Sequence, residues 1–91
     1  MDNLVLTPAQ LGKALHGARK LRGLSQKQVG ASVGMKQSTV SVIESDCART
    51  SVESLYKLLS ALDLELVVRS RPGVRPVGET APEQPYQPVE W

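Results

Sequence analysis

Apolar residues recur every three or four positions over the first two thirds of the chain, which is the spacing of buried helix faces. At the start of the first series, residues 7–10 read Thr-Pro-Ala-Gln, the order of a capping box with proline at the first helical position. Gly23 can end this helix in the left-handed conformation. The pattern predicts a helix from about Pro8 to Arg22. Its apolar face contains Leu11, Leu15, Ala18 and Leu21.

Two shorter helical segments follow. Ser25 and Gln28 form a second capping box, and Gly34 ends that helix after about two turns. A third helix is predicted from Gln37 to about Ser45. Its buried side contains Met35, Val40 and Ile43.

The N-cap position of the third helix is occupied by Lys36, which breaks a local rule. Lysine has no oxygen to accept from the first N–H groups, and it places a cation at the positive end of the helix dipole. Such conflicts are expected at functional sites. Anions around the helix end would remove the conflict at Lys36. The uncapped helix end therefore indicates a role in binding phosphate.

A capping box of Thr50 and Glu53 predicts a fourth helix that ends near Asp63. Its apolar stripe contains Val52, Leu55, Leu58, Leu59 and Leu62. Residues 64–69 then change to branched side chains in partial alternation, which is typical of a short strand. A lone strand lacks a backbone partner, and the same strand of a second copy is the simplest one. The expected dimerisation residues are Leu64, Leu66, Val67 and Val68.

The small size of the chain also favours a homodimer. A chain of 91 residues buries only about 60 to 65% of its unfolded surface, so part of its stability must come from elsewhere. The single cysteine, Cys47, excludes an internal disulfide. The single histidine, His16, without a Cys/His cluster excludes a zinc site. We therefore expect a second copy as partner, and no metal or cofactor.

Charge and proline content divide the chain. Residues 7–62 hold eight Lys/Arg against three Asp/Glu, whereas residues 72–91 hold one arginine against three glutamates. From Pro72 onward the sequence has five of the six prolines and no Leu, Ile, Met or Phe, too little apolar surface to offset chain ordering. The predicted fold class is all-α, with a short C-terminal strand. The predicted regions are a four-helix domain over residues 1–63, a dimerisation strand over 64–70 and a disordered tail over 71–91.

The second and third helices have the length and pattern of a helix-turn-helix, because only residues 34–36 separate them. In that motif the first helix lies across the phosphate backbone and the second enters the major groove. Gln37 can bond to an adenine edge, and Lys36 can reach a phosphate or a guanine. The moderately basic body agrees with a polyanionic partner, although many solvated domains share such a charge. The expected DNA contacts are Gln26, Lys27, Lys36, Gln37, Ser38, Thr39 and Ser41.

Over about residues 8–63 the chain resembles the phage-repressor or Xre-type helix-turn-helix family. The resemblance is carried by the order and spacing of Arg19, residues 23–26, Gly34, residues 37–41, Ile43 and Glu44. It implies a compact lambda-repressor-like domain in which Gln26 contacts phosphate and braces Gln37. It also implies an ion pair between Arg19 and Glu44 that ties the first helix to the recognition helix.

A narrower resemblance includes the rest of the chain. Residues 6–8 before the first helix, residues 36–37, the strand, and the terminal Glu90-Trp91 together are similar to the HipB-type antitoxins. This resemblance implies a dimer that represses its own operon and restrains a HipA-type serine/threonine kinase toxin. It implies further that the tail binds the kinase through Trp91 and Glu90.

Several residues also have interpretations without function. Gln37 and its polar neighbours would look the same on a solvated helix face, and Lys36 would look the same as an incidental surface lysine. Arg19 and Glu44 could form only an exposed pair, worth under about 1 kcal/mol. His16 is predicted to face solvent.

Among functional classes, an enzyme is not expected. The sequence has no Ser/His/Asp or Cys/His arrangement, no glycine-rich phosphate loop and no paired acids. Its apolar runs are too short for a membrane span, and the N-terminus lacks a signal-peptide pattern, so we expect a cytoplasmic, nucleoid-associated protein. The alternative to an antitoxin is a stand-alone dimeric repressor, in which Trp91 is only an exposed terminus.

Overall fold

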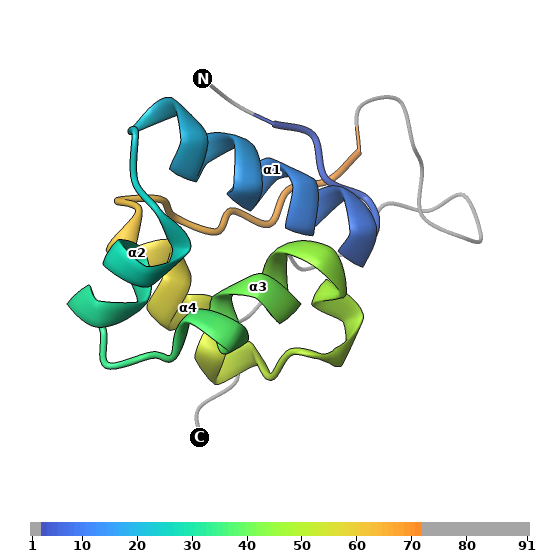
Figure 1. Ribbon diagram of the computed structural model, residues 1–91. Coiled ribbons are helices and arrows are strands. Elements are labelled where there is room, and N and C mark those ends of the chain that lie inside the picture. Colours follow the sequence, from blue (N-terminus) through green and yellow to red (C-terminus); the bar gives the residue numbers. More distant parts are fainter. Residues whose placement is uncertain (1–2, 72–91) are drawn as a thin grey trace, which may run out of the picture.

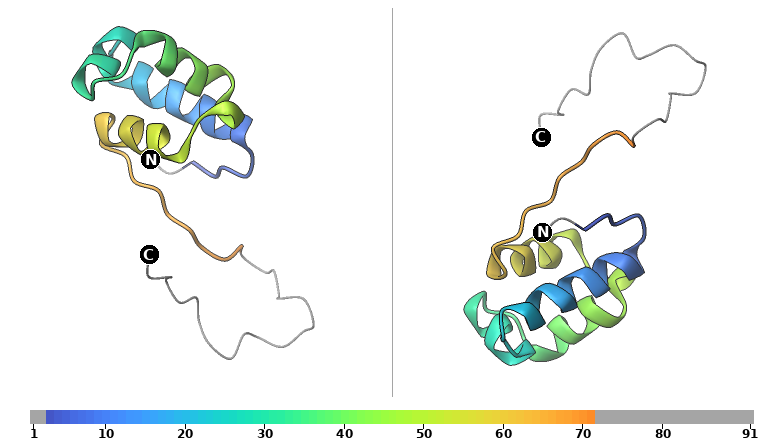
Figure 2. Two further views of the ribbon diagram at one scale, coloured as in Figure 1. Left: turned by 90° about the horizontal axis from the view of Figure 1, so that it is seen from below. Right: turned by 90° about the horizontal axis from the view of Figure 1, so that it is seen from above.

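The computed structural model describes residues 3–71, and within them it contains the four predicted helices but not the predicted strand (Figure 1). The elements are α1 (Pro8–Leu21), α2 (Gln26–Ser32), α3 (Gln37–Ser45), the 3-10 turn η1 (Cys47–Arg49) and α4 (Val52–Ala61). Helix α3 packs against both α1 and α2, and α2 also contacts α4. In both views of Figure 2, α1 lies between α3 and α4. Within residues 3–71 no helix has the length and hydropathy needed to cross a membrane.

The first two helices begin at the predicted capping boxes. The amide of Gln10 donates to the Thr7 hydroxyl at 3.1 Å, and the Gln10 side-chain oxygen accepts from the Thr7 amide at 3.1 Å. Ser25 and Gln28 make the same reciprocal pair at 3.0 and 2.8 Å. These bonds are local, so three residues of sequence are enough to predict them.

The fourth helix begins one residue later than predicted. Its N-cap is Ser51, whose hydroxyl accepts from the amide of Ser54 at 3.1 Å. Thr50 does not cap α4, because its amide closes η1 by donating to the carbonyl oxygen of Cys47 at 3.0 Å. Its hydroxyl oxygen is buried without a hydrogen-bond partner among the described residues. The unpredicted turn η1 therefore displaces the cap, and the proposed Thr50–Glu53 box is wrong.

The core is built from the apolar faces of all four helices and from Cys47. Two residues were wrongly assigned to the buried faces, since Leu21 is 79% exposed and Val52 is 67% exposed. In the last turn of α1 the inward position belongs to Arg19, only 5% exposed, and a residue two places later points to the opposite side of the helix. The buried apolar side chains are Leu15, Val29, Val40, Ile43, Cys47, Leu58, Leu59 and Leu62.

Beyond α4, residues 64–71 extend away from the helical body (Figure 2). Their departure is anchored by Arg22, which donates to the Leu62 carbonyl at 2.7 Å and lies 3.0 Å from the Asp63 carboxylate. The Leu64 amide donates to the Leu59 carbonyl at 2.9 Å, and in this single chain the rest of the segment belongs to no helix or sheet. The predicted strand is thus not formed without a partner, and its pairing across a dimer stays a prediction.

Gly12 and Gly17, both in α1, offer a matched test of close helix packing. A Cβ at position 12 would lie 2.6 Å from the carbonyl oxygen of Glu44, whereas a Cβ at position 17 would meet nothing within 4 Å. We expect Gly12→Ala to lower the free energy of unfolding by about 1 to 3 kcal/mol, because α1 and α3 must move apart. Gly17→Ala should raise it by about 0.5 to 1 kcal/mol, since alanine is the better helix former. Urea unfolding measures both, and equal effects would contradict the close approach.

Candidate nucleic-acid interface

Two glycines hold α2 and α3 close together. The amide of Met35 donates to the carbonyl oxygen of Gly30 at 2.8 Å, and a Cβ on Gly30 would collide with the Met35 carbonyl. Gly34 has a φ of +68°, which glycine adopts at little cost. The connection is therefore tight, and the start of α3 is placed beside α2.

The start of α3 presents polar side chains and an uncapped helix end. Lys36, Gln37 and Ser38 are exposed, while Thr39 and Ser41 are half-buried. Lys36 makes no capping hydrogen bond through its side chain. The first N–H groups of α3 therefore lack a side-chain acceptor from the N-cap residue and can bind an anion. The exposed amide and hydroxyl can meet the polar edges of bases.

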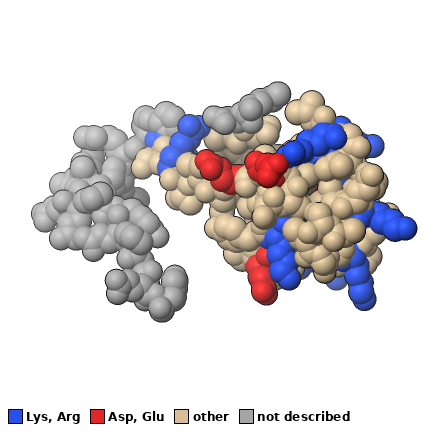
Figure 3. Space-filling model, turned by 90° about the vertical axis from the view of Figure 1, so that its left-hand side faces the viewer, with Lys and Arg blue, Asp and Glu red and all other residues tan. Residues whose placement is uncertain are grey.

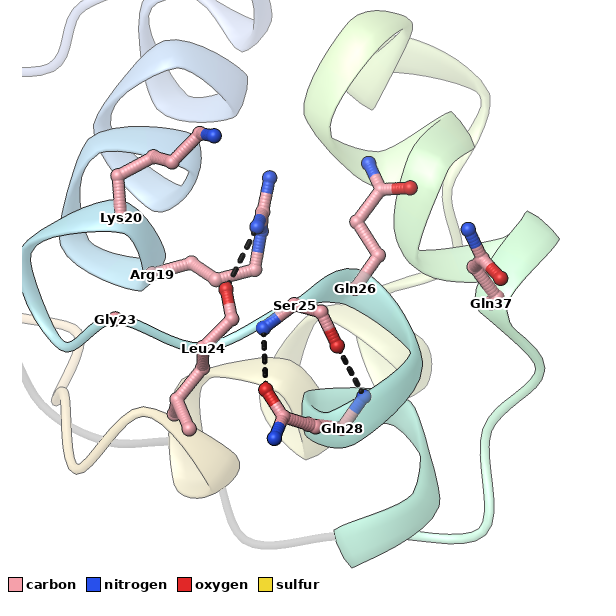
Figure 4. A pocket seen from close by; sticks show the side chains of 8 residues that line it. All are labelled: Arg19, Lys20, Gly23, Leu24, Ser25, Gln26, Gln28 and Gln37. Carbon is pink, nitrogen blue, oxygen red and sulfur yellow. Dashed lines mark hydrogen bonds between the residues drawn. The ribbon is translucent and has the colours of Figure 1, made fainter.

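An open hollow of about 490 Å³ lies beside this helix end (Figure 4). Gln26 from α2 and Gln37 from α3 extend toward the same side of it, and the exposed Lys20 of α1 adds positive charge. Lys27, the next residue of α2, is exposed. The lining residues are Arg19, Lys20, Gly23, Leu24, Ser25, Gln26, Gln28 and Gln37.

A buried ion pair joins α1 to α3 below the hollow. Arg19 Nε and Nη2 donate to the two oxygens of Glu44 at 2.6 and 3.0 Å, and the two side chains are only 7% and 4% exposed. Arg19 Nη1 also donates to the Leu24 carbonyl at 2.8 Å, just before α2. The pair is therefore not a weak surface contact. It holds three helical segments in one arrangement.

The Glu44 carboxylate has two further partners. His16 Nδ1 lies 2.9 Å from Glu44 Oε1, and Gln26 Nε2 donates to the same oxygen at 3.1 Å. Burial by itself raises the pKa of Glu44, but the hydrogen bonds from Arg19, His16 and Gln26 outweigh it and lower the pKa to about 2. Glu44 is thus an ionised acceptor shared by α1, α2 and α3.

The structure differs from two expectations about this cluster. Gln26 was expected to brace Gln37, but within residues 3–71 its amide bonds to Glu44 and makes no hydrogen bond to Gln37. His16 was expected only to face solvent, yet one of its nitrogens contacts Glu44. The available signal was its place three residues before Arg19, which puts both side chains on one face of α1.

The remaining candidate residues lie elsewhere. Leu64, Leu66, Val67 and Val68 are exposed on the segment after α4, away from the hollow. Glu90 and Trp91 lie outside the described residues. Cys47 is buried in the core, and burial raises the pKa of its thiol, which keeps it in the unreactive form.

Comparison with known proteins gives consistent results. A helix-turn-helix family pattern matches residues 15–68. Antitoxin HipB of Escherichia coli O6:H1 (strain CFT073) is 30% identical over 87 residues, which cover 96% of this chain and 87% of that protein. A chain of the solved "HipA-HipB-O2-O3 complex" aligns with a TM-score of 0.73 at 26% identity, over 76% of this chain and 97% of its own. The "HipB-O4 20mer complex" aligns with the same values.

Acid should weaken the fold through Glu44. Its folded pKa of about 2 lies below the ordinary 4.5, so the ionised carboxylate stabilises the fold above about pH 4.5. This contribution, about 3 kcal/mol, is lost as the pH falls toward 2. We expect Glu44→Gln to lower the free energy of unfolding at pH 7 by about 3 to 5 kcal/mol, because it leaves Arg19 buried without its anion. Between about pH 5 and pH 2 the Glu44→Gln variant should also lose less of its free energy of unfolding than the wild type does.

Urea unfolding as a function of pH measures this effect, with Glu53→Gln as control. Glu53 is exposed on α4 and should leave the acid profile close to that of the wild type. A Glu44→Gln profile that parallels the wild type would contradict the assignment.

Proposed function

The chain belongs to the helix-turn-helix family and, within it, to the HipB-type antitoxins, and from this premise we propose that it binds operator DNA as a homodimer and represses its own operon. The observation that carries the proposal is the uncapped, exposed start of α3 beside the hollow that Gln26 and Gln37 line. A helix end of this kind binds phosphate through its free N–H groups, and its polar side chains fit base edges in the major groove.

The role of each helix follows from its position. Helix α3 enters the major groove with Gln37 against an adenine, while Ser38 and Ser41 bond to bases or phosphate. Helix α2 lies across the backbone, where Gln26 and its neighbour Lys27 reach phosphates. Lys36 contacts a phosphate or a guanine, and the bound anions remove the unfavourable interaction of its charge with the helix dipole.

The charge distribution supports an anionic partner. Residues 7–62 carry eight cationic side chains against three acidic ones. On the face shown in Figure 3, Lys and Arg side chains reach several edges of the helical body. Such a surface attracts DNA from a distance and orients it before the specific contacts form.

The segment after α4 supports dimerisation. Val67 and Val68 are 68% and 91% exposed, and Leu66 is 47% exposed, in a stretch whose backbone has no sheet partner in the single chain. We propose that residues 64–70 pair with the same segment of a second copy, which buries these side chains and satisfies the backbone. The two recognition helices would then sit about 34 Å apart, one turn of DNA.

We also propose that the chain neutralises a HipA-type serine/threonine kinase as the antitoxin of the same operon. Support comes from the antitoxin relative and from the likeness to a chain of the HipA-HipB-O2-O3 complex. Residues 71–91, with Glu90 and Trp91, would contribute tail contacts to the kinase. A kinase-encoding reading frame beside this one favours the antitoxin, and its absence favours a stand-alone repressor.

Gln37→Ala tests base recognition. A duplex first selected by the wild type from a random pool is titrated with each variant over a series of salt concentrations. We expect Gln37→Ala to weaken binding by about 1 to 3 kcal/mol and to relax the preference at one base pair. Lys36→Ala should weaken binding to all sequences and lower the salt slope by about 1. Lys57→Ala, on α4, is the control, and a Gln37→Ala titration equal to that of Lys57→Ala would refute the assignment of the recognition helix.

Two truncations test the dimer. Deleting residues 72–91 should leave the dimer and DNA binding intact, because the proposed strand is kept. Deleting residues 64–91 should give monomers or a much weaker dimer, since the paired segment is removed. Sedimentation equilibrium measures both, and loss of the dimer on the shorter deletion would show that the interface lies elsewhere.

A further inference from the structure

We infer that His16 is a further contact to the DNA backbone, and that this contact forms only when its Nε2 atom carries a proton. The inference rests on the proposed function, because it needs DNA on the face formed by α2 and α3. It makes the affinity for DNA depend on pH through one side chain.

The position of His16 places it at the edge of this face. Its ring is half exposed, at the side of α1 that packs on α3. His16 Nδ1 and Gln26 Nε2 both approach one atom, Glu44 Oε1, at 2.9 and 3.1 Å. The imidazole therefore lies next to Gln26, which lines the hollow together with Gln37. A duplex whose backbone reaches Gln26 brings phosphates close to the ring.

The contact with Glu44 determines which nitrogen carries the hydrogen in the neutral ring of His16. The Glu44 carboxylate is ionised at neutral pH and can only accept hydrogen bonds. A nitrogen at 2.9 Å from it must carry the hydrogen, so His16 donates from Nδ1. Arg19 Nη2 lies 3.3 Å from the same nitrogen. Because it is also a donor, it could bond to Nδ1 only in the other tautomer, which the shorter contact with the Glu44 carboxylate disfavours. Nε2 is then the atom that gains or loses a proton.

Nε2 is available for an external acceptor. Within residues 3–71 it makes no hydrogen bond to the protein, and the ring is half exposed. Once protonated, the imidazolium can donate from Nε2 to a phosphate oxygen while Nδ1 stays on Glu44. The arrangement orients the ring in advance, so little side-chain freedom is lost when DNA binds.

The charges around His16 have opposing effects on its protonation. Glu44 on α3 favours the imidazolium, whereas Arg19 on the same helix disfavours it. Lys13 and Lys20, three residues before and four after His16 on α1, also disfavour it, and α2 presents only the neutral amide of Gln26. A DNA phosphate adds a second anion beside the ring. Binding should therefore be accompanied by proton uptake, and affinity should rise as the pH falls.

The composition of the chain makes this testable, because His16 is the only histidine in the sequence. Histidine is the side chain that ordinarily changes charge between pH 5 and pH 8. Cys47 is buried, and burial raises the pKa of its thiol, away from that range. A pH-dependent change in DNA affinity that one substitution at position 16 removes can be assigned to this ring.

The experiment measures the dissociation constant of the full chain for its selected duplex at pH 6, 7 and 8, each over a series of KCl concentrations. For the wild type we expect affinity to rise severalfold from pH 8 to pH 6, and by no more than about tenfold per pH unit for one proton. The salt slope should be steeper at pH 6 than at pH 8 by about 0.9, the value for one added phosphate contact.

Three variants isolate the cause. His16→Asn keeps an amide donor near the position of Nδ1 but cannot become charged, so its affinity and salt slope should not change with pH. His16→Lys carries a fixed charge and should bind tightly at all three pH values. Lys57→Gln removes an exposed charge from α4, outside the group of charges around His16, and should keep the pH dependence of the wild type.

Each outcome separates this inference from the proposed function. If the wild type binds its duplex with the same salt slope at pH 6 and pH 8, or if His16→Asn keeps the pH dependence, the phosphate contact is refuted while DNA binding stands. If affinity depends on pH but the salt slope does not, His16 only braces Glu44 and the inference is wrong. If no duplex is recovered by selection at any pH, it is the proposed function that fails.

Discussion

The arrangement of the helices depends on one buried carboxylate. Glu44 lies near the end of α3 and accepts hydrogen bonds from α1 and α2 at once. Removing an ionised carboxylate and a guanidinium from water is costly, and the cost is offset only when nearly every lone pair and N–H finds a partner. The bidentate geometry of Arg19, together with Gln26 and His16, supplies those partners. An apolar pair could fill the same volume, but it would not fix the relative rotation of three helices.

The carboxylate can be reached only because the backbones approach closely. Gly12 in α1 faces the carbonyl of Glu44, and Gly30 in α2 faces the carbonyl of Met35. In both places a side chain would push a neighbouring segment away, which would lengthen the hydrogen bonds to Glu44. Glycine at these two positions lowers the intrinsic stability of the helices. What is gained is the short spacing that the polar cluster requires.

Features that depend on adjacent residues could be predicted from the residue pattern, whereas features that depend on distant ones could not, with one exception. The Arg19–Glu44 pair spans 25 residues, and it was expected only because the family resemblance implied it. The capping boxes at Thr7 and Ser25 involve three-residue spacings, and their prediction was correct. The shift of the α4 cap from Thr50 to Ser51 follows from η1, which depends on packing against α1 and α3. The contact of His16 with Glu44 spans 28 residues, and its one local sign is the three-residue spacing between His16 and Arg19. The proposed strand over residues 64–70 would form only against a second chain, so a single chain cannot test its prediction.

The polar cluster also links stability to recognition. Glu44 bonds to the buried Arg19 on one side, and on the other it orients Gln26 and His16, which lie at the face where we propose that DNA binds. A substitution that weakens the ion pair would therefore loosen the two side chains for which we propose phosphate contacts, even where the helices remain folded. The base recognition proposed for Gln37 depends less directly on the ion pair, since the Gln37 side chain makes no hydrogen bond to the cluster within residues 3–71. Changes in the core should thus alter the contacts of this domain with the DNA backbone. The preference for particular bases should depend only on the exposed first turn of α3.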